Sequence, residues 1–228
     1  MKRMVIFSNG NLSDTSFVKT IVEKDDFIVC TDGGARYALE QDLIPNILIG
    51  DMDSVESEVY QSIIQKGTEI IRYPARKDKS DFELAVDYAL GKKAKKILIF
   101  GLLGDRIDHF LGNILLLQKV RKENRSLGII IYEGNKTIYF VDKELEIEGE
   151  INDELSVIPL TKIENITLKG LVYKLSNAVL NIGTSLGISN ILKKKRVKIS
   201  LKKGLVMVVH AKRLSSTPEV VASDYEKV

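Results

Sequence analysis

The chain has 228 residues, with 34 lysines and arginines against 31 aspartates and glutamates, and a formal net charge of +3. Hydrophobic residues at 44% and charged residues at 29% are ordinary for a folded globular protein, which excludes a disordered or fibrous chain. The single cysteine, Cys30, cannot form an internal disulfide, and no apolar stretch reaches the roughly 20 residues that a membrane span needs. We therefore expect a cytoplasmic protein with no membrane partner.

Residues 1–130 alternate between short β-branched runs and longer segments with helical spacing. The spacing predicts strands at 4–10, 26–34, 46–54, 69–75, 95–104 and 127–134. It predicts helices up to 24 with Asp14 as the cap, and at 35–41, 55–66, 80–90 and 107–123. This alternation is typical of an α/β domain with three layers, in which helices cover both faces of a mostly parallel sheet.

Residues 131–214 have a different period, because their apolar segments are short and joined by turn residues. Seven strands are expected, at 137–142, 144–150, 154–160, 164–170, 172–176, 196–204 and 205–211. Such a pattern predicts a C-terminal all-β domain, either a sandwich or a partly open barrel. Residues 215–228 are expected to form a loose tail.

Charge is distributed unevenly over this second part of the chain. Residues 142–154 contain seven acidic side chains and residues 193–203 contain seven basic ones. Two solvated strand faces opposite each other explain this pattern, and a surface for nucleic acid or another polyanion is the alternative. Aromatic side chains are not interleaved with the basic run, so we expect no nucleic-acid partner.

Acidic residues follow four successive strands of the first part. In an open parallel sheet, ligands bind beyond the carboxyl ends of the strands, so these residues are expected to share one edge. A single acid there is ordinarily a helix cap or a turn residue, but recurrence at four strand ends favours a shared cation site. The acids are Asp32, Asp51, Asp53, Asp78, Asp81, Asp105 and Asp108.

Their spacing indicates which acids can act together. Asp51 and Asp53 are two residues apart, so in an extended segment both project to the same side and can ligate one hard cation. Asp81 lies three residues after Asp78, at the start of the helix predicted from Ser80.

Glycines and basic residues near these acids indicate phosphate binding. Gly101 and Gly104 follow a strand and precede a helix that begins near Arg106, an arrangement that brings backbone N–H groups close to a phosphate. Arg106 and Lys77 suit polyphosphate oxygens. No P-loop or dinucleotide fingerprint is present, so the pattern favours metal-assisted phosphoryl chemistry.

The two histidines are assigned different roles. His109 adjoins Asp108 and either contacts a ligand or holds that carboxylate in place. His210 ends an apolar run and is expected to be structural. With no cysteine partner near either histidine, a zinc site is not expected.

Five short motifs occur in order along the chain: DGGA at 32–35, GDMDS at 50–54, KDKSDFELA at 77–85, GLLGDRIDHFLGN at 101–113 and GISN at 187–190. As an ordered set they resemble thiamine pyrophosphokinase. The resemblance implies a homodimer with an α/β N-terminal domain and a β-sandwich C-terminal domain. It also implies transfer of the pyrophosphoryl group of ATP to thiamine, with release of AMP and use of Mg²⁺.

The resemblance also implies roles for individual residues. Its catalytic carboxylates are Asp51, Asp53, Asp81 and Asp108, of which the first three would bind the metal. Its ATP-binding residues are Asp32, Gly33, Lys77, Asp78, Gly101, Gly104, Arg106 and His109. Its thiamine-binding residues are Ser189 and Asn190. Either Asp108 or Asp81 would accept the proton of the thiamine hydroxyl. Ser80 stands where the family often has threonine, and the chain has no tryptophan to stack on thiamine.

Two other functions remain as alternatives. A metal-dependent nucleotide phosphohydrolase would use the same acids with water as the acceptor, but it leaves GISN and the β domain without a role. A module that binds nucleotides or RNA through residues 193–203 does not explain four acidic strand ends, which repel a polyanion.

Overall fold

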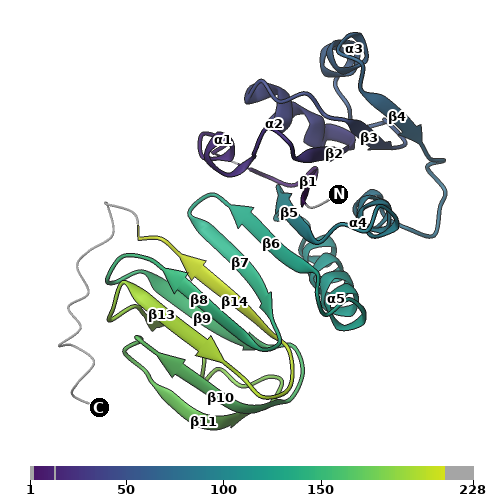
Figure 1. Ribbon diagram of the computed structural model, residues 1–228. Coiled ribbons are helices and arrows are strands. Elements are labelled where there is room, and N and C mark those ends of the chain that lie inside the picture. The colour runs from purple at the N-terminus through teal and green to yellow at the C-terminus, as the bar shows by residue number, and fades with distance from the viewer. Residues whose placement is uncertain (1–2, 13, 214–228) are drawn as a thin grey trace. The chain divides into compact units, whose positions relative to one another are not determined.

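The computed structural model describes residues 3–12 and 14–213. The chain divides into two compact units, unit 1 ending at Gly134 and unit 2 beginning at Asn135 (Figure 1). No helix among the described residues is both long enough and apolar enough to cross a membrane. The tail expected at 215–228 lies outside the described residues.

Unit 1 contains a parallel sheet in the order β6-β5-β1-β2-β3-β4, and every neighbouring pair of these strands is parallel. Its strands are β1 (Arg3–Phe7), β2 (Phe27–Thr31), β3 (Ile47–Gly50), β4 (Glu69–Arg72), β5 (Lys96–Phe100) and β6 (Gly128–Glu133). Its helices are α1 (Val18–Ile21), α2 (Ala35–Glu40), α3 (Ser57–Gln65), α4 (Asp81–Gly91) and α5 (Ile107–Glu123), with a 3₁₀ turn η1 (Asp32–Gly34) before α2.

The sheet of unit 1 is covered by helices on both faces, which confirms the predicted three layers. Phe7, Cys30, Leu48 and Phe100 pack on one face with residues of α1, α2 and α3. On the other face α4 packs against β2 and β3, and α5 against β6. Figure 1 shows α1, α2 and α3 on one side of these strands and α4 and α5 on the other. The thiol of Cys30 lies in this core, where burial raises its pKa.

The first helix is much shorter than predicted. Instead of capping it, the Asp14 carboxylate accepts a hydrogen bond from the Ser16 N–H at 2.8 Å. The helix begins only at Val18 and ends at Ile21, and Val22 is extended. Aspartate competes with helix formation in this way because its short side chain can bond the backbone two residues later.

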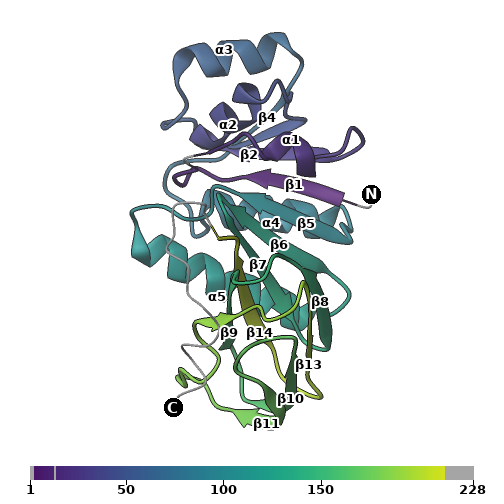
Figure 2. The ribbon, with the colours of Figure 1, turned by 90° about the vertical axis from the view of Figure 1, so that its left-hand side faces the viewer.

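Unit 2 is a sandwich of two antiparallel sheets, in the orders β12-β9-β14-β7 and β11-β10-β13-β8. Buried side chains from both sheets, among them Val157, Ile166, Val197 and Val208, form one core, so the sandwich replaces the barrel alternative. Its short strands can be followed in Figure 2. They are β7 (Lys136–Val141), β8 (Glu144–Glu148), β9 (Glu154–Pro159), β10 (Ile163–Lys169), β11 (Leu175–Leu180), β12 (Asn190–Ile191), β13 (Arg196–Ser200) and β14 (Val206–Ala211).

Two predictions for unit 2 were wrong in detail. The strand expected at 172–176 lies further along the chain, at Leu175–Leu180, because this edge strand alternates too weakly for its register to be read. The strand β12, Asn190–Ile191, was not predicted, since two residues are too short to show a period.

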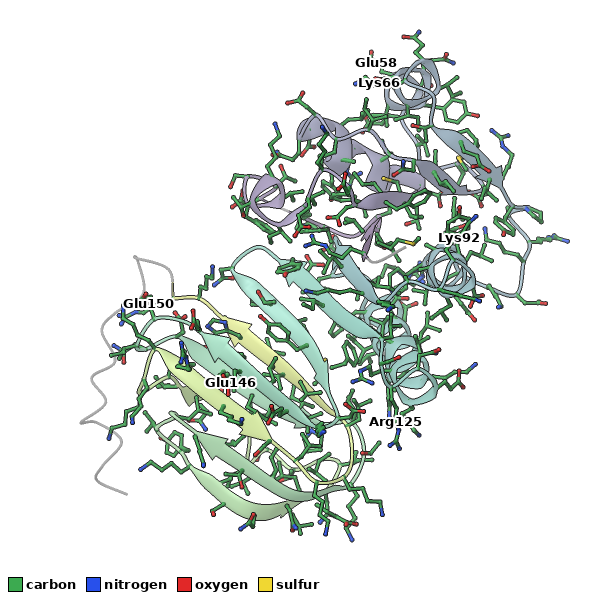
Figure 3. All side chains as sticks on the ribbon, in the orientation of Figure 1. Glu58, Lys66, Lys92, Arg125, Glu146 and Glu150 are labelled. Carbon is green, nitrogen blue, oxygen red and sulfur yellow. The ribbon has the colours of Figure 1, made fainter. Side chains whose placement is uncertain are left out.

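The acidic and basic runs of unit 2 are neighbouring strands. β8 pairs with β13 in a register that places Glu148 opposite Arg196 and Glu146 opposite Lys198. The Arg196 guanidinium lies 2.8 Å from the Glu148 carboxylate, and Lys198 Nζ lies 3.0 Å from Glu144 and 3.2 Å from Glu146, which Figure 3 labels. The hypothesis of two solvated strands that face each other is confirmed.

Because the glutamates of β8 neutralise the basic side chains of β13, we expect that the protein shows no salt-dependent binding to a short random-sequence oligonucleotide. The measurement is fluorescence anisotropy at about 50 and about 200 mM salt. A variant with Glu144, Glu146 and Glu148 all changed to glutamine leaves the basic strand uncompensated and should bind at low salt. Tight binding by the unmodified chain that weakens at high salt would contradict this prediction.

A buried polar cluster closes one end of unit 2. Asp153 is 2% exposed and His210 is 3% exposed. The Asp153 carboxylate lies 2.8 Å from His210 Nε2 and accepts hydrogen bonds from the backbone N–H groups of Glu150 at 3.0 Å and Arg213 at 2.8 Å. His210 therefore has the structural role expected from the sequence.

Replacing Asp153 by alanine should lower the free energy of unfolding by about 3 kcal/mol, since it removes the hydrogen-bond partner of buried His210 and of two partly buried backbone N–H groups. Chemical denaturation followed by circular dichroism measures this change. The matched control is Glu154→Ala on the exposed side of β9, which should change stability by less than about 0.5 kcal/mol. Equal effects of the two substitutions would show that the cluster adds no stability.

Candidate active site

A cavity of about 650 Å³ lies in unit 1 where the carboxyl ends of β1, β2, β3 and β5 meet the starts of α4 and α5. The predicted strand ends therefore do gather at one edge of the sheet. The lining residues are Ser8, Asn9, Gly10, Asn11, Thr31, Asp32, Arg36, Asp51, Asp53, Ser54, Ser80, Asp81, Phe82, Leu102, Gly104, Asp105, Arg106, His109 and Asn113.

Three carboxylates in this cavity come close enough to share a cation. Asp32, Asp51 and Asp53 each place an oxygen within 4.8 Å of the others. Burial, and then the charges of Asp81 and Asp51, raise the pKa of Asp32 to about 7. The hydrogen bond from the Asp53 N–H, 3.1 Å long, lowers the pKa of Asp51. The cluster thus concentrates negative charge that a bound cation would relieve.

Asp81, the third predicted metal ligand, lines the same cavity, and Asp32 is a further candidate because it lies within 4.8 Å of Asp51 and Asp53. Lys77 Nζ lies 2.9 Å from an Asp81 oxygen and 3.9 Å from an Asp51 oxygen. Burial lowers the pKa of Lys77, but the nearby carboxylates, Asp81 first, outweigh burial and raise it. Lys77 is therefore a counter-ion to the acids.

Close approach between loops at the cavity depends on glycine at two positions. At Gly50, where φ is +154°, a Cβ atom would lie 1.8 Å from an Asp32 oxygen. At Gly10 a Cβ atom would lie 2.1 Å from the Leu103 carbonyl oxygen. Any side chain at Gly50 would displace the Asp32 carboxylate, which also accepts a hydrogen bond from Met52 N–H at 3.1 Å. The glycine of GDMDS thus sets the position of an acid 18 residues earlier in the chain.

At the start of α5, Asp108 and Arg106 form a two-pronged ion pair, with N–O distances of 3.0 and 2.6 Å. The hydrogen bonds from Arg106 hold the pKa of Asp108 far below its usual range. Arg106 and His109 line the cavity, whereas Asp108 is not among the lining residues. Asp108 is exposed and lies beside two lining residues, so its catalytic role stays a prediction.

The turn at Gly101–Gly104 is held by an acid that the sequence analysis missed. Glu133, 6% exposed at the end of β6, accepts hydrogen bonds from the N–H groups of Leu102 and of Leu103, the latter at 2.8 Å. These two N–H groups are consequently occupied and do not face a phosphate. The sequence did contain one indication of this role, because Glu133 is a charged residue at the end of the apolar run GIIIYE.

Because one oxygen of Glu133 accepts both bonds, Glu133→Gln should destabilise the protein less than Glu133→Ala. We expect the free energy of unfolding to fall by about 1 kcal/mol or less for glutamine and by about 2 kcal/mol for alanine. Urea denaturation measures both changes. Equal losses would indicate that these hydrogen bonds do not hold the turn.

The remaining predicted residues are placed as follows. Gly33 is buried and Asp78 is exposed, and neither is among the lining residues. In unit 2, the Asn190 amide accepts a hydrogen bond from Tyr173 N–H at 3.0 Å and donates one to the Tyr173 carbonyl at 2.6 Å. That amide is used within unit 2, whereas Ser189 is exposed.

Sequence reasoning also missed the lining residues Ser8–Asn11 and Arg36. The segment SNGN follows the first predicted strand, so the reasoning that selected the other four strand ends could have found it. Arg36 lies directly after the DGGA motif and carried no signal of its own.

A parallel sheet whose strand ends combine a cluster of acids close enough to share a cation with arginines is typical of an α/β enzyme that acts on phosphate groups. A separate β-sandwich follows it in the same chain. Unit 1 and unit 2 therefore define a two-domain enzyme of phosphoryl-transfer chemistry.

Comparison with known proteins identifies the family. Residues 18–129 match the model of the thiamin pyrophosphokinase catalytic domain, and residues 142–206 match that of the thiamin pyrophosphokinase vitamin B1 binding domain. Thiamine pyrophosphokinase of Bacillus subtilis is 36% identical over 213 residues, covering 92% of this chain and 99% of the relative. The chain belongs to the thiamine pyrophosphokinase family.

Solved structures agree with this assignment. The crystal structure of thiamine pyrophosphokinase from Bacillus subtilis superposes with a TM-score of 0.84 at 30% identity, covering 93% of this chain and all of that one. The enzyme from Geobacillus thermodenitrificans gives a TM-score of 0.79 at 26% identity, covering 95% and 100%. The predicted fold class and enzyme class are confirmed, and the phosphohydrolase alternative is not supported.

Proposed function

We propose that the cavity of unit 1 is where this chain transfers the pyrophosphoryl group of ATP to the hydroxyl of thiamine, giving thiamine diphosphate and AMP. The observation that carries this proposal is the group of three carboxylates, Asp32, Asp51 and Asp53, within a cavity of about 650 Å³. A cavity of this size accommodates a nucleotide-sized ligand.

Mg²⁺ fits the donor set of this cavity. Asp32, Asp51 and Asp53 supply oxygen atoms, which Mg²⁺ prefers. Burial and then the neighbouring carboxylates raise the pKa of Asp32, and a cation would favour its charged form. When bound, Mg²⁺ neutralises charge on the phosphate oxygens. Asp81 is the predicted ligand that lies outside this group, and its carboxylate is paired with Lys77.

In the reaction, the thiamine oxygen forms a bond to the β-phosphorus of ATP, and the bond from that phosphorus to the oxygen of the departing AMP breaks. Arg106 and Lys77 supply positive charge beside the phosphates, and His109 lies on the same wall as Arg106. Asp81 is the better acceptor for the hydroxyl proton, because it lines the cavity and Asp108 does not. Asp78, Gly33 and Gly101 stay predictions as ATP-binding residues.

The homodimer implied by the family resemblance is part of the proposal. Ile107, Leu111 and Leu115 form an exposed apolar stripe at helical spacing along α5, with exposed fractions of 71%, 54% and 60%. In unit 2, Ile182 and Leu186 are also exposed, close in sequence to Ser189. Contiguous apolar side chains on a protein surface are typical of an interface.

Ser189 is the proposed thiamine contact in unit 2, with Asn190 positioning its loop.

Analytical ultracentrifugation tests the dimer. We expect the unmodified chain to sediment as a dimer and Leu111→Glu to sediment as a monomer, because a charge on the stripe cannot be buried unpaired. The control is Glu58→Lys, which reverses an exposed charge on α3, away from the stripe. If the unmodified chain is monomeric at micromolar concentration, the dimer is ruled out.

The direct test of the function is incubation with ATP, thiamine and Mg²⁺, followed by chromatography of the nucleotides and the thiamine species. AMP and thiamine diphosphate should appear in equal amounts. Formation of ADP with thiamine monophosphate would contradict pyrophosphoryl transfer, and release of phosphate independent of thiamine would indicate a hydrolase.

A further inference from the structure

Arg36 differs from the other basic residues at the cavity because no carboxylate neutralises it. Five aspartates line the cavity, whereas Arg36 and Arg106 are the two arginines among its described lining residues. Arg106 is paired with Asp108, and Lys77 is paired with Asp81. Among the residues that the structure describes, no carboxylate forms an ion pair with Arg36.

The Arg36 guanidinium is held in place by its neighbour, Tyr37. It stacks over the Tyr37 ring, 4.6 Å from the ring centre, and one of its nitrogens donates a hydrogen bond to the Tyr37 hydroxyl at 2.8 Å. The Tyr37 side chain is buried, so its ring is a rigid support. An arginine that is stacked and bonded loses little further freedom when it binds an anion.

The Tyr37 hydroxyl connects Arg36 to another wall of the cavity. It donates a hydrogen bond to the Gly10 carbonyl at 2.6 Å and accepts one from the Leu12 N–H at 3.0 Å. With the bond from Arg36, its one proton and two acceptor sites are all used. Arg36 and the lining segment Gly10–Asn11 are therefore positioned together.

We propose that Arg36 binds the phosphate groups of the nucleotide substrate. The guanidinium can donate to two phosphate oxygens at once, and a polyanion supplies the negative partner that the described chain lacks at this position. Tyr37 is the positioning residue that orients it. This inference rests on the proposed function, since it assigns a positive charge, in addition to Arg106 and Lys77, that holds ATP in a cavity lined by five aspartates.

Equilibrium binding of inorganic tripolyphosphate in the presence of Mg²⁺ tests the role of Arg36 without turnover and without a base or sugar. Isothermal titration calorimetry on Arg36→Gln should show affinity reduced about 10- to 100-fold. Arg36→Lys, which keeps the charge but not the two-pronged geometry, should recover part of the loss. The control is Arg125→Gln. Arg125, which Figure 3 labels, lies in the exposed turn after α5, and this variant should bind tripolyphosphate like the unmodified chain.

Steady-state kinetics separate phosphate binding from a purely structural effect. In Arg36→Gln the KM for ATP should rise at least about tenfold, while the KM for thiamine stays within about twofold. Tyr37→Phe keeps the ring and removes the hydroxyl, and should weaken tripolyphosphate binding about threefold.

Tripolyphosphate affinity within twofold of normal in Arg36→Gln would overturn the inference. So would equal rises in both KM values, which would indicate a general disturbance of the cavity. If the unmodified chain binds tripolyphosphate but forms no thiamine diphosphate, the proposed function fails while the role of Arg36 is still measured by the binding data.

Discussion

Replacing Asp51 or Asp53 by asparagine is expected to lower kcat by about 100- to 1000-fold while leaving the fold intact. Each substitution keeps the size of the side chain and removes one anionic oxygen donor from a cluster whose atoms lie within 4.8 Å of one another. Asparagine binds Mg²⁺ far less well than a carboxylate, so the charge on the phosphates is no longer neutralised.

The measurement is AMP formation with saturating ATP and thiamine over a range of Mg²⁺ concentrations. Circular dichroism should give an unchanged spectrum, because both side chains lie at the surface of the cavity rather than in the core. Asp25→Asn, an exposed aspartate before β2, is the control and should turn over normally. Near-normal turnover of both Asp51→Asn and Asp53→Asn would exclude them as metal ligands.

Asp32→Asn is expected to stabilise the metal-free protein at neutral and alkaline pH. Burial, and then the charges of Asp81 and Asp51, raise the pKa of Asp32 from 3.8 to about 7. Between those two values the folded protein holds a proton that the unfolded chain has lost, so the free energy of unfolding falls as pH rises through this window. Above about pH 7 the decrease in the free energy of unfolding is complete.

Asparagine has no proton to lose, and its oxygen can still accept the hydrogen bond from Met52 N–H. The stability advantage of Asp32→Asn over the unmodified chain should therefore grow by about 2 kcal/mol between pH 5 and pH 8. Thermal melting in EDTA at several pH values measures this difference. Mg²⁺ should then raise the melting temperature of the unmodified chain more than that of the variant.

Two results would count against this account of Asp32. One is a variant that follows the unmodified chain at every pH, which would show that Asp32 titrates normally. The other is an equal response to Mg²⁺ in both proteins, which would remove Asp32 from the cation site. The same substitution should abolish most turnover, so a gain in stability and a loss of activity are expected together.

Local patterns were sufficient for most elements of the fold. The helix predicted at 107–123 is α5, Ile107–Glu123, and all six strands of unit 1 were predicted, because strand and helix periods are written in consecutive residues. The failures were also local. Asp14 forms a turn with Ser16 in preference to a cap, and β12 is too short to have a period.

The strand-end rule likewise predicted where the site would lie but not how its members pair. Asp32, Asp51, Asp53 and Asp81 were all expected at one edge, and all line one cavity. The pair of Lys77 with Asp81 spans four residues, a spacing that the sequence contains. That Asp32 would approach Asp51 and Asp53 depends on side chains that follow different strands, and no spacing within the sequence contains that information.

The sequence by itself determined the two kinds of domain, the acidic strand ends and, through five ordered motifs, the family. Tertiary structure decided which groups are available for chemistry. Glu133 accepts the hydrogen bonds of N–H groups in the Gly101–Gly104 turn, and Asp108 is paired with Arg106. Arg36 is bonded to Tyr37 and has no carboxylate partner among the described residues. The physical reason is that periodicity and motifs are properties of neighbours in sequence, whereas burial and ion pairing depend on neighbours in space.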